Sequence, residues 1–173
     1  MNHPWVAILR AVNVGGTGKL PMAELREIAT TIGFQDVRTY IQSGNLLFSS
    51  DLPEEEIRVL LEDALAAHLG TPVDVVIRSA EELRHIVDAN PFPDAPGARV
   101  GVALSGTPVD STILEGIRTP GHEEVVAGRR EIYTHYPDGM GQSKFALPRA
   151  AGPMTVRNIN TLTKLAASAS TLQ

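Results

Sequence analysis

The sequence lacks cysteine altogether, and aromatic residues make up only 5% of its 173 positions. Without cysteine the chain forms no disulfide, uses no thiolate in catalysis and holds no metal through sulfur. A β-sheet that reads RNA needs exposed aromatic side chains on its central strands. The first apolar stretch offers one aromatic residue, Trp5, at its edge, so the sequence gives little support to RNA reading.

Long apolar runs are also missing, and none approaches the roughly 20 residues that a membrane-spanning helix needs. The first residues show no basic segment followed by an apolar stretch, so no signal peptide is predicted and we expect a cytoplasmic protein. The formal net charge is -5. Proteins that bind duplex DNA or anionic membranes depend on positive charge, so neither partner is expected.

The first half of the chain shows the pattern strand, helix, strand, strand, helix, strand. Apolar stretches between turn residues predict the strands, and apolar residues at helical spacing predict the helices. Gly33 and Gly70 follow the two helical patterns and suit their C-terminal ends. The strands are expected at 5–14, 37–41, 46–49 and 73–77, and the helices at 21–32 and 53–69. This order predicts an α+β fold that begins with a ferredoxin-like βαββαβ unit.

The second half repeats part of this order after a proline-rich stretch. A connecting helix at 80–89 is followed by three prolines within 90–96, which predict a boundary between domains 1–90 and 97–173. Strands are then expected at 100–104, 123–126 and 131–135, and helical segments at 111–117, at 143–151 and after a capping Thr155. The order βαββα predicts a second, incomplete ferredoxin-like half without its last strand. No repeat of individual residues is evident, so duplication is a hypothesis based on element order alone.

A glycine-rich segment between the first strand and the first helix is the most informative local pattern. Arg10, Asn13, Gly15, Gly16 and Lys19 fall within it. A strand, a glycine loop and a helix start in that order bring backbone N–H groups and cations together, as in sites that hold anions. The spacing fits neither the P-loop nor the dinucleotide-binding fingerprint. A flexible turn with ordinary surface cations is the alternative interpretation.

Two further polar motifs are candidates for ligand contact. Gln42, Ser43 and Asn45 lie in the turn between the second and third strands, where they either read a polar ligand or bond their own backbone. Arg157, Asn158 and Thr161 fall in the last predicted helix. The side chains of Arg157, Thr161 and Lys164 are expected to form one polar stripe, which is either an anion site near a helix start or a solvated face.

Familiar catalytic and metal-binding templates are not met. The five histidines show no metal-ligand spacing, and Ser43 lacks the glycines of a nucleophile elbow. No acid–base pair stands out among the carboxylates. The residues therefore name neither a reaction nor a cofactor.

Three segments carry a resemblance to a known bacterial family. Residues 7–25, which include the glycine-rich segment, and residues 33–48, which include the hairpin, resemble the opening of domain-of-unknown-function family 1697. Residues 155–165 resemble its C-terminal signature. The resemblance implies an α+β protein built from ferredoxin-like units and assigns no function.

Because the polar motifs fall within the family's motif segments, we expect them to form one ligand-binding site. Its predicted residues are Arg10, Asn13, Gly15, Gly16, Lys19, Gln42, Ser43, Asn45, Arg157, Asn158 and Thr161.

Three functional interpretations remain open from the sequence. The first is a pocket, binding or catalytic, for a small anionic ligand that bears a phosphate or carboxylate. The second is a non-catalytic module that contacts a protein or single-stranded nucleic acid through its sheet face. In the third, the polar motifs are folding determinants that satisfy buried backbone groups and pair with acids.

Overall fold

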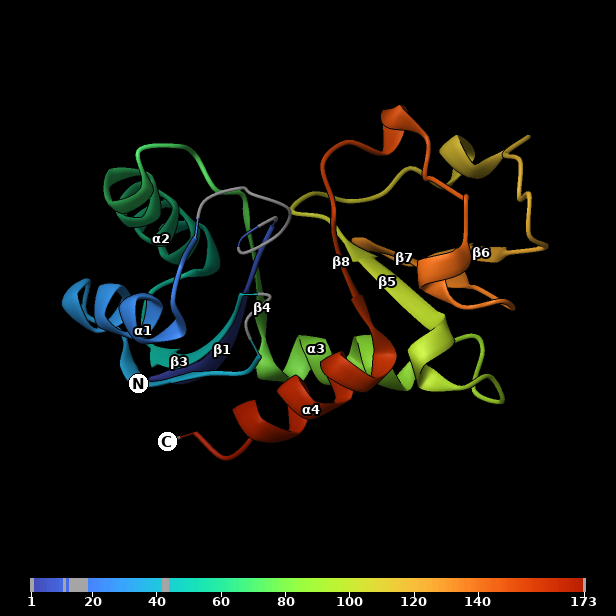
Figure 1. The fold of residues 1–173 in the computed structure, drawn as a ribbon. Coiled ribbons are helices and arrows are strands. Elements are labelled where there is room, and N and C mark those ends of the chain that lie inside the picture. The colour runs from blue at the N-terminus through green and yellow to red at the C-terminus, as the bar shows by residue number, and fades with distance from the viewer. Residues whose placement is uncertain (1, 11, 13–18, 42–43, 173) are drawn as a thin grey trace. The chain divides into compact units, whose positions relative to one another are not determined.

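The computed structural model describes residues 2–10, 12, 19–41 and 44–172 of the chain. It is a mixed α and β fold with two four-stranded antiparallel sheets and four α-helices. The chain divides into two compact units, one formed by Met1–His85 with Lys164–Gln173 and the other by Ile86–Thr163. Each unit contains one of the sheets (Figure 1).

The first unit follows the predicted order of elements. Its sheet has the strand order β2-β3-β1-β4, with every neighbouring pair antiparallel. The elements are β1 (His3–Leu9), α1 (Met22–Thr31), β2 (Gln35–Thr39), β3 (Asn45–Ser50), α2 (Glu54–Leu69) and β4 (Val75–Ser79).

The core of the first unit lies between this sheet and the helices α1 and α2. Alternate residues of the strands contribute to it, among them Ala7, Leu9, Leu46 and Phe48. Alternate strand residues point to the same face of a sheet, so α1 and α2 cover one face together (Figure 1). Phe34 stacks on Phe48 with ring centroids 4.1 Å apart.

The opposite face of this sheet is also buried. Val6, Ile8 and Leu47 are at most 1% exposed there. Arg38, from β2, donates a hydrogen bond through Nη1 to Thr171 Oγ1 at 3.0 Å. Thr171 belongs to the C-terminal segment of the same unit, so the end of the chain completes the first unit.

Both helix ends predicted from glycine are confirmed. Gly33 follows α1 with φ +101°, and Gly70 follows α2 with φ +76°. Several strand bounds differ from the prediction, two of them for a clear physical reason. β1 ends at Leu9, whose N–H bonds Gly44 O. β2 ends at Thr39, because Ile41 has φ +53°, which a strand residue does not adopt.

The second unit contains a fourth strand that the sequence analysis missed. Its sheet has the order β6-β7-β5-β8, antiparallel throughout. The prediction of a half without its last strand is therefore wrong. The strands are β5 (Val100–Leu104), β6 (Glu124–Ala127), β7 (Glu131–His135) and β8 (Thr155–Asn158).

Helical segments of the second unit are shorter than predicted. The segment expected at 111–117 is a short 3₁₀ helix, η2 (Ser111–Leu114), capped by Asp110. The prediction of a helix at 143–151 is wrong, because Pro148 has no N–H to donate to an internal helical hydrogen bond. Only the short 3₁₀ helix η4 (Arg149–Ala151) forms after it. Two more 3₁₀ turns are η1 (Gly97–Arg99) and η3 (Met140–Gln142).

Two longer helices contain residues of both units. The helix α3 (Ala80–Asp88) begins among first-unit residues and ends among second-unit residues, and α4 (Ile159–Ala169) does the reverse. Ser79 Oγ accepts a hydrogen bond from Glu82 N–H at the start of α3. Asn158 Oδ1 accepts one from Thr161 N–H at the start of α4. Both helices thus begin at a side-chain cap directly after the last strand of a sheet.

Equivalent strands in the two sheets also pair in the same register. Val6 on β1 pairs with Leu47 on β3 and Arg78 on β4. Val102 on β5 pairs with Tyr133 on β7 and Arg157 on β8. Arg78 and Arg157 therefore stand at equivalent positions, each one residue before the cap of a helix.

Candidate functional site

The C-terminal end of β1 brings together two of the three predicted motifs. Leu9 N–H donates to Gly44 O at 2.8 Å, which ties the strand end to the hairpin turn. Arg10 N–H donates to Asp74 O at 3.0 Å, just before β4 begins. Arg10 therefore leaves the sheet between the hairpin turn and the start of β4.

Gly44 is required where the hairpin turn meets the segment after β1. Its φ is +91°, a left-handed conformation that favours glycine. A Cβ at this position would lie 2.6 Å from Val12 Cγ2 and 2.9 Å from Leu9 Cβ. The turn is thus packed against Leu9 and Val12, which fixes the hairpin beside Arg10.

Arg10 has an exposed acidic neighbour. Its Nη1 lies 3.4 Å from Asp74 Oδ2, and the two side chains are 47% and 61% exposed. An ion pair this long and this exposed contributes about 0–1 kcal/mol to stability. The guanidinium is consequently held in place weakly and stays accessible to a second anion.

Asn45 has a structural role in the hairpin. The residue is fully buried, and its Nδ2 donates to Tyr40 O at 2.9 Å. Tyr40 N–H in turn donates to Asn45 O at 3.0 Å. Asn45 therefore closes the turn through both its side chain and its backbone.

Lys19 is an exposed cation shortly before α1. Pro21 occupies the position before the helix, and α1 has no side-chain cap among the described residues. The predicted site residues Asn13, Gly15, Gly16, Gln42 and Ser43 lie outside the described part of the chain.

The third predicted motif belongs to the second unit, and its local structure differs from the prediction. Thr155 is a buried strand residue and caps no helix, because the backbone from Thr155 to Asn158 pairs with β5. The expected helical stripe of Arg157, Thr161 and Lys164 is therefore wrong at its first member. Asn158 is the actual cap, and asparagine ranks above threonine there, so this signal was present in the sequence.

Partial burial of Arg157 affects the pKa of its guanidinium group. Desolvation lowers the pKa of the Arg157 guanidinium to about 10. Its Nη1 donates to Val156 O at 3.0 Å. The group stays protonated at neutral pH in a setting that disfavours its charge, and such perturbed groups are enriched at functional sites.

Comparison with known proteins identifies the family. Residues 1–133 match the family model described as "Protein of unknown function (DUF1697)". The chain belongs to this family. The match includes the glycine-rich segment and the hairpin, and it ends before Arg157. A search of curated proteins found no match.

One solved structure of similar fold is the conserved bacterial protein SP0830 from Streptococcus pneumoniae. The two chains share 23% sequence identity with a TM-score of 0.81, and the similarity covers 98% of this chain and 99% of the other. At this identity the similarity supports the fold alone.

Among the described residues, no group of three or more His, Asp or Glu side chains is arranged to hold a metal ion. None of the helices that the described residues form is long and apolar enough to cross a bilayer.

A cavity that the sequence did not predict lies between α1 and α2. It is lined by Glu24, Glu27, Ile28, Thr31, Ile32, Ala64, Ala67 and His68. No predicted site residue with a described position is among them. A signal was present, because alanines at 64 and 67 leave space where larger side chains would fill the gap between two helices.

Proposed function

We propose that the protein binds a small anionic ligand, bearing a phosphate or a carboxylate, at the end of the first sheet where β1 leads into the glycine-rich segment. The contact of Gly44 with Leu9 and Val12 carries this proposal, because it holds the hairpin turn beside Arg10. Two motifs that are separate in the sequence thereby supply groups to one place. The chain belongs to a family of unknown function, and this membership is compatible with the proposal but does not test it.

The charges at this place suit an anion. Arg10 is accessible, and its bond to Asp74 is long enough for a phosphate to compete with the carboxylate. Lys19 is exposed and precedes the N-terminal end of α1, where free N–H groups favour negative charge. The hydrogen bond of Asn45 to Tyr40 O supports a role of Asn45 in holding the turn in position.

The remaining predicted site residues enter the proposal as expectations. Backbone N–H groups of Gly15 and Gly16 would contact the anion, and Asn13, Gln42 and Ser43 would provide specificity. Arg157, Asn158 and Thr161 belong to the second unit. Their contribution to the same ligand is a separate prediction that needs its own variant.

A thermal-shift screen tests the proposal with inorganic phosphate, phosphorylated sugars, nucleotides and dicarboxylates as probes. A probe at about a hundred times its Kd stabilises the folded state by about 2.7 kcal/mol. We expect Arg10→Ala and Lys19→Ala to abolish the shift while leaving the melting temperature without ligand nearly unchanged. Arg84→Ala, at an exposed arginine on α3, is the matched control and retains the shift.

Two results would count against this site. If no probe raises the melting temperature of the wild-type protein, the anion proposal fails. If Arg10→Ala alone lowers the melting temperature by several degrees without affecting any ligand, the arginine is a folding determinant. Arg157→Ala, compared with the exposed Arg149→Ala, then shows whether the second unit contributes to binding.

Among the described residues, the central strands of the two sheets offer no surface for the alternative of a sheet-face interaction module. All six residues of β3 and all five of β5 are buried, so these central strands present no open surface. A ferredoxin-like architecture for each unit remains part of the proposal. The order βαββαβ in the first unit and the matching strand orders of the two sheets support it.

A further inference from the structure

We propose that the groove between α1 and α2 is a docking site for a basic amphipathic helix of a partner protein. The groove has a volume of about 480 Å³ and belongs entirely to the first unit. It is separate from the anion site proposed above, so each proposal can fail without the other.

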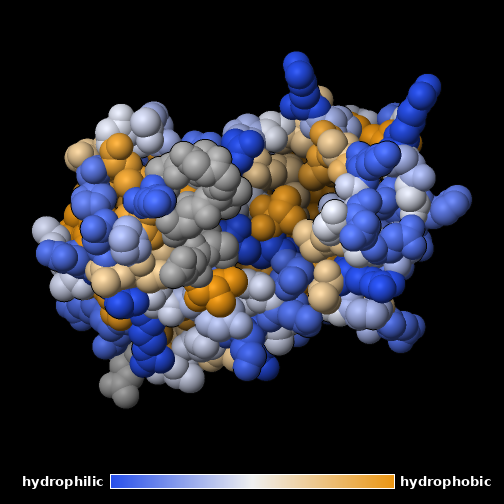
Figure 2. Space-filling view, in the orientation of Figure 1, coloured by the Kyte–Doolittle hydropathy of each residue, from blue (hydrophilic) through white to orange (hydrophobic). Residues whose placement is uncertain are grey.

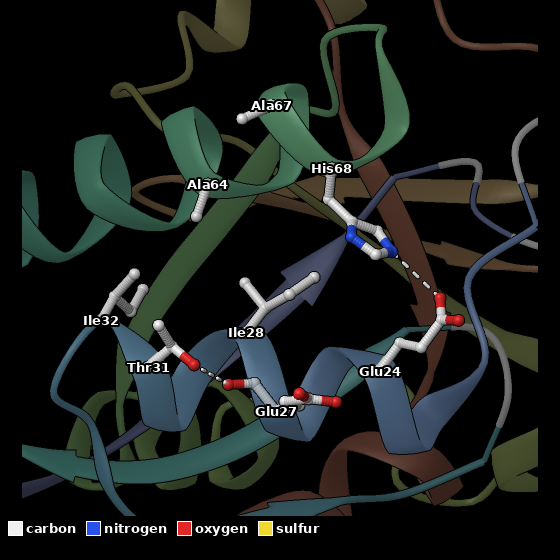
Figure 3. Close-up of a pocket in the computed structure, with 8 residues that line it drawn as sticks. All are labelled: Glu24, Glu27, Ile28, Thr31, Ile32, Ala64, Ala67 and His68. Atoms are coloured by element: carbon white, nitrogen blue, oxygen red, sulfur yellow. Dashed lines mark hydrogen bonds and ion pairs between the residues drawn. The ribbon is translucent and has the colours of Figure 1, made fainter.

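The floor of the groove is apolar. Ile28 from α1 and Ile32, at the C-terminal cap of this helix, face Ala64 and Ala67 from α2 (Figure 3). Leu60 precedes Ala64 by one helical turn and is 38% exposed, which extends the apolar strip along α2. Figure 2 shows apolar residues among hydrophilic ones over α1 and α2. An apolar strip between two helices accepts the apolar face of a third helix.

The rim of the groove is acidic. Glu24 Oε2 lies 3.0 Å from His68 Nε2, so this pair bridges the two helices at one end of the groove (Figure 3). Glu27 is exposed, and among the described residues no cation lies within ion-pair distance of its carboxylate. A ligand with an apolar face and flanking cations would satisfy both the floor and the rim.

The charge of the whole helix pair selects a basic partner. The helices α1 and α2 carry seven Asp and Glu side chains against two arginines, Arg26 and Arg58. This excess of negative charge equals the net charge of the entire chain, which is -5. Arg58 is engaged with Glu55 and Glu62, and Arg26 donates to Thr39 Oγ1. Neither arginine is among the residues that line the groove, so the negative charge of Glu24 and Glu27 attracts cationic segments and repels acidic ones there.

A helix fits this surface better than an extended strand. The lining residues of α1 and its C-cap Ile32 follow the spacing i, i+3, i+4, i+7 and i+8 from Glu24, and those of α2, from Ala64 to His68, span about one turn. A partner helix would place apolar anchors at matching intervals along the groove and lysine or arginine side chains over Glu24 and Glu27.

Fluorescence anisotropy tests the proposal with three labelled 18-residue model peptides. The first has a leucine stripe and lysines elsewhere, the second has the same composition in scrambled order, and the third replaces lysine by glutamate. We expect the first peptide alone to bind the wild-type protein well, with its affinity reduced at high salt. Equal binding of the scrambled peptide would show non-specific attraction and overturn the proposal.

Matched variants locate the peptide on the protein. Ala67→Arg adds bulk and positive charge to an exposed position in the groove, and Ala167→Arg makes the same change at an exposed position of α4. We expect Ala67→Arg to weaken binding by about tenfold or more and Ala167→Arg to change it less than about twofold. Similarly, Glu27→Lys weakens binding and the exposed Glu115→Lys does not. Equal effects of the members of either pair would refute the groove as the site.

Two other occupants are distinguished in the same experiments. Binding of a small amine such as benzylamine, with no binding of the striped peptide, would replace the proposal by a small-molecule site. Concentration-dependent dimerisation of the wild-type protein that Ala67→Arg abolishes would assign the groove to a second copy of the chain. Melting temperatures of all variants within about 2 °C of wild type verify that each is folded.

Discussion

Arg78 and Arg157 occupy equivalent positions in the two sheets, but different residues follow them four positions later. Arg78 is 1% exposed, and its Nε lies 3.3 Å from Glu82 Oε1. At the place of Glu82 the second unit has Thr161. The first unit therefore places a carboxylate beside its buried arginine from within the same strand–helix junction.

The pairing of Arg78 with Glu82 predicts a coupled effect on stability. Glu82→Gln removes the charge that compensates a buried guanidinium, and we expect it to lower the free energy of unfolding by roughly 1–2 kcal/mol, reduced because Glu82 is 31% exposed. In an Arg78→Met background the same change should have almost no effect. Urea denaturation of the two single variants and the double variant measures this coupling. Additive effects would contradict it.

Gly44 predicts a second effect on stability. Gly44→Ala forces a Cβ against Val12 and Leu9 in a left-handed conformation, and we expect a loss of roughly 2–4 kcal/mol. Gly33 has φ +101°, and no atom lies within 4 Å of the point that a Cβ would occupy there. Gly33→Ala should therefore cost only about 1 kcal/mol. Similar melting temperatures for the two variants would show that the hairpin turn is not packed against the strand end.

Tyr133 gives a prediction about pH. Its buried O–H donates to Ile86 O at 2.6 Å, and burial, with Glu131 nearby, raises the pKa of Tyr133 above its ordinary value. Tyr133→Phe should destabilise the protein by about 1 kcal/mol at pH 8. A raised pKa means that the folded state holds this proton more tightly than the unfolded state. The advantage of tyrosine is then complete below about pH 10 and declines as the pH rises further.

Urea denaturation of wild type and Tyr133→Phe at several pH values from 8 to 11 measures the decline. Other titrating groups affect both proteins alike, so the difference between the two free energies of unfolding isolates Tyr133. A difference that stays constant above pH 10 would contradict the assignment of a buried, hydrogen-bonded phenol.

Local signals in the sequence explain which parts of the fold were predictable. Gly33 and Gly70 end α1 and α2 because only their own backbone conformation is involved. β8 was not predictable in this way, since its four residues become a strand by pairing with β5, about fifty positions earlier in the chain. Pro148 did signal against a helix at 143–151, and the apolar and helix-forming residues around it were given too much weight.

The candidate site was likewise predictable in part from local sequence signals. Arg10 and the hairpin were predicted to share a site, and the structure brings their segments into contact through Leu9, Val12 and Gly44. Asn45 was expected to contact a ligand or its own backbone, and its bond to Tyr40 O supports the second role. The groove was missed because Ala64 and His68 share a helical face with core residues, and spacing alone does not separate a core face from the edge of a groove.

The passage of α3 and α4 from one unit to the other has a consequence for dissecting the protein. Residues 164–173 belong to the first unit although 78 residues of the second precede them, from Ile86 to Thr163. No single cleavage of the polypeptide separates the two units with all their parts. An isolated N-terminal fragment would lack its own final segment, so autonomous folding is better examined by circular permutation, with the C-terminal helix supplied ahead of Met1, than by truncation.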